Sequence, residues 1–260
     1  MKSKRADIQH RCCFDTMFRL VFHGPTERNF IRLWFPEIIS SDNRDLPTQI
    51  DRIVSCTGRE KTVLLEKHSP VGAGVQPEVS AEGQVSSNEY GYELELTVRN
   101  LTDNPLPLIT PAVCMQLSAA VDFVDTSMQR TYVRISGTPA LLCETRREWH
   151  DPRTQKYYLE TATVEPPDNA TLIYDGTNHW GVSPTRVDSP LIVTHSRVGD
   201  WNVGIRFDDA QTVSNNAKPF MACLHSTPTA AVIPPASMAR FHGQIVIVRG
   251  AVEDVFDDFG

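Results

Sequence analysis

Period-two alternation of apolar and polar residues runs through most of the chain and constrains its fold more than any other feature. The segment YELELTVR (92–99) alternates strictly, as expected for a strand that is buried on one face only. The same pattern recurs at 201–207 and 240–247, and further strands are predicted at 131–135, 157–164, 191–194 and 220–225. Helical periodicity is scarce, and Pro36 interrupts the one candidate helix at 29–39, which fits a strand equally well. Strands without intervening helices predict an all-β fold, an antiparallel β-sandwich.

The size and the cysteine content agree with this class. A chain of 260 residues buries roughly three quarters of its unfolded surface, so we predict one β-sandwich domain over residues 1–260 that needs no disulfide or metal to fold. The six cysteines form no CxxC pair, and Cys114 and Cys223 lie in apolar runs, where a free cysteine behaves as a small hydrophobe. We therefore predict neither a metal site nor a cofactor. The acidic tail, residues 252–258, is expected to be a solvated terminus.

Charge and hydropathy exclude some partners. The formal net charge of −7 argues against nucleic acid, because binding a phosphate backbone requires a concentrated cationic surface. No window approaches the roughly eighteen apolar residues of a membrane helix, and the basic N-terminus lacks the apolar core of a signal peptide. We expect a cytoplasmic protein with no membrane partner, and its oligomeric state stays open.

The last two predicted strands carry the side chains best suited to chemistry. The alternation places Cys223 and His225 on one face of the first strand, and Arg240, His242 and Gln244 in a row along the second. If the two strands are hairpin partners, both histidines lie at the same end of one sheet face, where imidazole can transfer a proton. Guanidinium and amide groups there would hydrogen-bond a hydroxylated ligand. The alternative is an ordinary solvated strand face.

Two other arrangements are possible. The loop YDGTNHWGVSP holds His179 and Trp180, and an exposed indole can stack on a sugar ring, although it can equally fold back over the core. A cupin-like metal site would have to combine His179, His195, His225 and His242, which no short HxH spacing supports. Phosphate loops, GxSxG elbows and HExxH motifs are absent from the sequence.

The segment VRNLTDNPLPL (98–108), between two alternating stretches, resembles the central hairpin of the galactose mutarotase-like β-supersandwich proteins. This family includes aldose epimerases and sandwich domains of polysaccharide lyases and glycosidases. The resemblance covers about residues 92–123 and favours a supersandwich, with a jelly roll or an immunoglobulin-like sandwich as alternatives. It departs at residues 111–116, where epimerases carry a histidine and this chain has none, so it implies the fold and not the family mechanism. As a whole the sequence is also similar to a group of bacterial proteins of unknown activity.

These observations together predict a carbohydrate-processing protein that acts on a sugar or glycoside by epimerisation, elimination or hydrolysis. His225 and His242 are the expected catalytic acid/base groups. Arg240, Gln244, His179 and Trp180 are the expected substrate-binding groups. A non-catalytic carbohydrate-binding or assembly module and a cupin-like metal enzyme are the alternatives.

Overall fold

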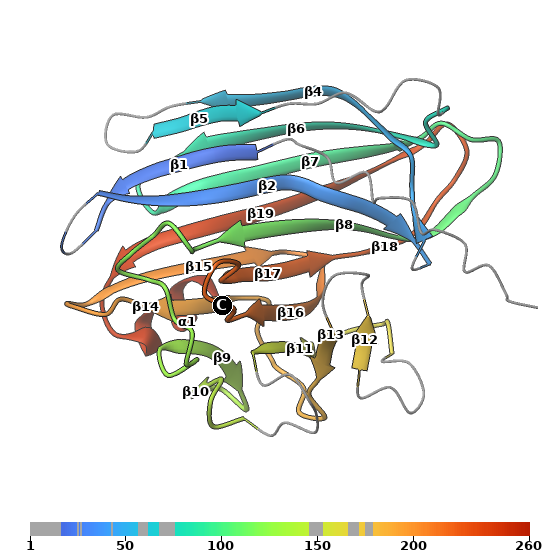
Figure 1. Ribbon diagram of the computed structural model, residues 1–260. Helices are drawn as coiled ribbons and strands as arrows, with labels where there is room; N and C mark the ends of the chain where they lie inside the picture. The colour runs from blue at the N-terminus through green and yellow to red at the C-terminus, as the bar shows by residue number, and fades with distance from the viewer. Residues whose placement is uncertain are drawn as a thin grey trace, which may run out of the picture.

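The fold is that of a computed structural model, which describes residues 17–24, 26, 28–42, 44–56, 62–67, 76–145, 153–165, 172–174 and 179–260. Two β-sheets, one lying over the other, make up almost all of it, so that strands of the two sheets alternate down the view in Figure 1. The all-β sandwich predicted from the alternation is confirmed.

Sheet A contains eleven strands within the described residues, in the order β12-β13-β11-β16-β17-β8-β2-β1-β5, with β3 paired to β2 and β18 paired to β8. The strands are β1 (Met17–His23), β2 (Arg28–Ser41), β3 (Arg44–Asp45), β5 (Thr62–Lys67), β8 (Leu106–Gln116), β11 (Thr154–Tyr158), β12 (Leu172–Tyr174), β13 (His179–Val182), β16 (Ala210–Asn216), β17 (Cys223–Pro228) and β18 (Ala230–Ile233).

Sheet B contains eight strands within the same described residues, in the order β10-β9-β14-β15-β19-β7-β6-β4. They are β4 (Thr48–Cys56), β6 (Val79–Ser87), β7 (Gly91–Asn100), β9 (Thr131–Ile135), β10 (Thr138–Leu141), β14 (Ile192–His195), β15 (Trp201–Phe207) and β19 (Met238–Arg249). One helix, α1 (Val252–Phe259), follows the last strand.

The alternation decides which face of each strand enters the core. Leu94 and Leu96 of β7 pack into one buried cluster with Phe241 and Ile245 of β19, and sheet A contributes residues such as Leu33 to the same cluster. We call the face that each sheet turns toward this shared core its inner face and the opposite one its outer face. Residues that alternate with the core positions therefore lie on the outer faces.

Several local predictions need correction. The pairs β4–β6 and β11–β13 are parallel, so the sandwich is not purely antiparallel. The strand expected at 220–225 begins at Cys223, and the one expected at 157–164 ends at Tyr158. The tail is not merely a solvated terminus, because α1 buries Val255 and Phe256 against the outer face of sheet B.

Candidate functional site

The centre of the candidate site is His225, in the middle of β17. Its neighbour Leu224 belongs to the core, and the Oγ atom of its other neighbour, Ser226, accepts a 2.9 Å hydrogen bond from the backbone N–H of Phe207 in sheet B. Both neighbours thus face inward, so the imidazole of His225 lies on the outer face of sheet A. Although it points away from the core, its residue is only 8% exposed. A buried imidazole outside the apolar core requires polar partners.

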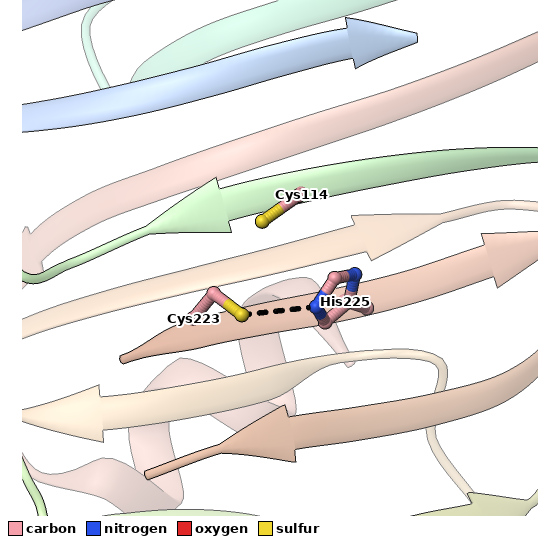
Figure 2. A group of neighbouring side chains, drawn as sticks. All are labelled: Cys114, Cys223 and His225. Atoms are coloured by element: carbon pink, nitrogen blue, oxygen red, sulfur yellow. Dashed lines mark hydrogen bonds between the residues drawn. The ribbon is translucent and has the colours of Figure 1, made fainter. Parts of the chain in front are cut away.

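Two cysteines supply such partners. Cys223 lies two residues before His225 on the same strand, and its Sγ atom is 3.1 Å from the His225 Nε2 atom. Cys114 comes from β8, the neighbouring strand, where Val113 and Met115 enter the core and turn Cys114 outward. Figure 2 shows the two sulfur atoms and the ring lying next to one another. A sulfur or nitrogen atom of each residue lies within 4.8 Å of those of the other two, and both cysteines are 6% exposed. We call these three residues the Cys114–Cys223–His225 cluster.

Cys114 and His225 each affect the pKa of the other. Contact with Cys223 together with burial raises the pKa of the Cys114 thiol well above its usual value. Burial alone would lower the pKa of His225, but the neighbouring Cys114, with a smaller contribution from Glu37, outweighs it, and the pKa of the imidazole is raised. Glu37 also contributes to the raised pKa of Cys114.

Half-buried polar and aromatic side chains surround the cluster on the same face. His225 pairs across the strands with Ser214 on β16, and Ser214 pairs in turn with Lys156 on β11. In the other direction Cys114 pairs with Trp34 on β2. In the adjacent row Cys223 pairs with Gln116, which in turn pairs with Arg32. Of these, Trp34, Arg32, Gln116 and Lys156 are partly exposed and Ser214 is buried. We call Arg32, Trp34, Gln116 and Lys156 the rim of the site.

This arrangement supports two kinds of chemistry. The guanidinium, amide and ammonium groups of the rim can donate hydrogen bonds to ligand oxygens, and an indole offers a flat apolar surface to a sugar ring. Thiols and an imidazole that converge in a buried cluster are ligands for a thiophilic metal ion or partners in proton transfer.

The structure does not bring the two predicted catalytic histidines together. β17 belongs to sheet A and β19 to sheet B, so the two strands are not hairpin partners. Because Phe241 and Ile245 of β19 enter the core, His242 lies on the outer face of sheet B, on the opposite side of the sandwich from His225. The expectation that both histidines lie at the same end of one sheet face is therefore wrong.

Arg240, His242 and Gln244 lie in a row on one face of β19, as the alternation predicted. Arg240 and His242 are exposed on the outer face of sheet B, beside the carboxylates of β7. Gln244 donates a 3.3 Å hydrogen bond from Nε2 to the Oε1 atom of Glu93. This row is an open, solvated strand face.

The remaining predicted residues do not complete a site with His225 in the described part of the chain. His179 and Trp180 begin β13, the strand next to the edge strand β12 of sheet A, and their side chains lie outside the described part of the structure. The Nδ1 atom of His195, in sheet B, lies 3.0 Å from the Asn202 Oδ1 atom. With His195 and His242 in sheet B and His225 in sheet A, the proposed four-histidine metal site is not formed.

Sequence reasoning missed Cys114 and Cys223 as site residues because both lie in apolar runs. The local signal was present, since Cys114 alternates with the core residues Val113 and Met115. The pairing of β8 with β17 was not visible, because Gln116 and Cys223 lie far apart in the sequence.

No family model matches the chain, and no curated protein matches it. Among solved structures it is similar to a galactose mutarotase-like protein from Clostridium acetobutylicum, at 9% identity and a TM-score of 0.36, covering 62% of this chain and 53% of the other. It is also similar to a putative aldose 1-epimerase from Klebsiella pneumoniae subsp. pneumoniae, at 10% identity and a TM-score of 0.33, covering 91% and 52%. The chain thus spans about half the length of each. Both are of the kinds named by the resemblance at residues 92–123.

Among the described residues, no helix has the length and apolar character needed to span a bilayer.

Proposed function

We propose that the protein binds a carbohydrate, or a similarly hydroxylated small ligand, on the outer face of sheet A and processes it there. The observation that carries this proposal is the pattern of the rim. Arg32 and Gln116 are cross-strand partners that offer hydrogen-bond donors, and Trp34 offers an aromatic surface two residues from Arg32 on the same strand. Lys156 offers a further donor on the other side of the cluster, on β11. Recognition of sugars commonly combines such polar groups with stacking on one ring.

Processing requires a group that moves a proton at the ligand. His225 lies on β17, in the middle of sheet A, and its imidazole suits the reaction classes expected from the sequence, which are epimerisation, elimination and hydrolysis. His242 has no part in the proposed site, because it lies on the opposite face of the sandwich.

The test compares two arginines on opposite outer faces. The full chain is screened on an array of neutral and acidic oligosaccharides, and ligands found there are measured by isothermal titration calorimetry. We expect Arg32→Ala to weaken binding by about 10- to 100-fold, the value of one lost charge-assisted hydrogen bond. The matched variant Arg240→Ala should bind as the wild type does. The reverse result would move the site to the row on β19 and overturn the proposal.

Incubation with the bound sugar separates processing from binding alone. If the ligand is processed, chromatography and NMR of the recovered sugar reveal a changed anomeric, epimeric or chain structure. Unchanged sugar after prolonged incubation, with binding intact, would favour the non-catalytic carbohydrate-binding module.

A further inference from the structure

The Cys114–Cys223–His225 cluster has the composition of a metal site. Two cysteine sulfurs and one imidazole nitrogen are a donor set that zinc uses in proteins, with bonds of about 2.3 Å to sulfur and about 2.0 Å to nitrogen. Donors around a tetrahedral zinc ion then lie roughly 3.5 Å apart. The 3.1 Å separation of Cys223 Sγ and His225 Nε2 and the overall limit of 4.8 Å bracket this value, so small side-chain rotations would suffice.

The placement of the cluster favours a metal over simple packing. Its members face away from the hydrophobic core, and two packed strands hold them at fixed positions. Burial of an imidazole is unfavourable unless its ring nitrogens have partners. A divalent cation bound by two thiolates forms a neutral unit, which removes the cost of burying either charge alone.

A disulfide is a poorer use of the same residues. Cys223 pairs directly with Gln116, so Cys114 occupies the diagonal position on the neighbouring strand. Diagonal neighbours lie roughly 7–8 Å apart, beyond the roughly 4.4–6.8 Å between α-carbons that a disulfide spans. A metal ion bridges such a gap because it adds two bonds of its own.

We propose that Cys114, Cys223 and His225 bind one zinc ion on the outer face of sheet A. Three protein donors leave zinc one open position, the arrangement typical of catalytic zinc sites. Water or a ligand oxygen can occupy this position. Zinc bound to the His225 imidazole would replace the proton-transfer role proposed for that residue above. Sugar binding by the rim does not depend on zinc, so the two proposals can fail separately.

The first experiment measures metal binding by the reduced, full-length chain. Zinc is titrated against a chromophoric chelator, and cobalt is used as a spectroscopic substitute, since thiolate ligands give it an intense charge-transfer absorption in the near ultraviolet. We expect about one equivalent per chain. Changes outside the ligand sphere alone weaken metal binding by about 10- to 100-fold, so Cys114→Ser and Cys223→Ser should each weaken it by about 100-fold or more. The control Cys143→Ser, at a half-buried cysteine of sheet B's edge region, should leave it unchanged.

A second variant keeps the test decisive should the single serine variants fail to fold. Cys12, Cys13, Cys56 and Cys143 are all replaced by serine, so that only the two cluster cysteines remain. Stoichiometric zinc binding, with two sulfur neighbours in its X-ray absorption spectrum, would support the site. Absence of binding by the wild type, or binding that survives in Cys114→Ser and disappears in the four-serine variant, would overturn it.

Discussion

At the scale of single residues, Asp122 is the clearest example of a polar side chain that holds separate segments together. Its backbone and side chain are buried, and the Asn29 Nδ2 atom donates a 2.7 Å hydrogen bond to its Oδ2 atom. Thr26 donates to the same carboxylate from its hydroxyl group and from its backbone N–H. Burial raises the pKa of Asp122, but these hydrogen bonds outweigh it, and the pKa lies below its ordinary value. The carboxylate thus fastens the β1–β2 connection to the segment after β8.

Replacing Asp122 by Asn should therefore destabilise the protein in a pH-dependent way. Because the folded pKa is depressed, the stabilisation is fully present above the unfolded value of about 3.9 and is lost as the pH falls through the folded value. We expect a loss of about 1–3 kcal/mol in the free energy of unfolding near pH 7. Urea unfolding at several pH values should show this difference shrinking below about pH 4.

The control for this prediction is Asp103→Asn, at an exposed turn position. That variant should match the wild type within about 0.5 kcal/mol at every pH. A difference between wild type and Asp122→Asn that stays constant down to the lowest pH would contradict the role given to the charge.

The sequence predicts the direction of single side chains better than it predicts their neighbours. The outward direction of His225 follows from its neighbours, because period-two alternation is local. That Cys114 lies beside it does not follow, since strand pairing depends on how the whole sheet packs. For the same reason the sequence does not predict that His225 and His242 lie apart. Their strands are close in the sequence but belong to different sheets.

At the scale of elements, strand β7 starts at a residue that must be glycine. Gly91 has φ of 151°, and a Cβ atom there would lie 1.9 Å from the carbonyl oxygen of Ile245 on β19. Gly137 offers a matched comparison, with φ of 76° and no atom within 4 Å of its Cβ position. The two glycines therefore share backbone strain but differ in available space.

Alanine substitutions at these glycines should separate the two effects. We expect Gly137→Ala to cost about 1 kcal/mol, the typical penalty for a positive φ. Gly91→Ala should cost about 3 kcal/mol or more, because β7 and β19 must also move apart. Chemical denaturation of both variants measures the difference. Equal losses would show that β7 can shift without harm to its pairing.

Elements with clear alternation were predicted well, as β9 shows by matching the expected 131–135. The helix α1 was missed because eight residues are too few to establish a helical period beside acidic residues that also suit a solvated tail. Its local signals are real, since Glu253 and Asp254 in the first turn suit the positive end of the helix dipole. Its helical state also depends on an apolar surface that only the folded sheet provides.

At the scale of the whole molecule, α1 packs on part of the outer face of sheet B. Val252, Val255 and Phe256 pack on Leu191, Val193 and Val246, forming a second apolar cluster apart from the main core. The sandwich thus has two unlike outer faces: the helix α1 partly covers that of sheet B, and that of sheet A carries the Cys114–Cys223–His225 cluster and its rim.

Removing the central contact of this helix should destabilise the fold and expose the sheet. We expect Phe256→Ala to lower the free energy of unfolding by about 3 kcal/mol, as for other buried phenylalanines. Phe259→Ala, which removes an edge contact to Tyr90 at 5.4 Å between ring centroids, should cost only about 1 kcal/mol. Thermal unfolding and light scattering measure both effects. A milder effect of Phe256→Ala than of Phe259→Ala would contradict the covering role of α1.

The pairing of β8 with β17 has a consequence for the order in which the molecule assembles. The ribosome must release residue 116 and then more than a hundred further residues before Cys223 can meet Gln116. Closing so long a loop is a late and slow event in the folding of a β protein. A ligand that contacts both β8 and β17 can therefore bind only after the two strands have paired. Its binding stabilises the chains in which this pairing is complete.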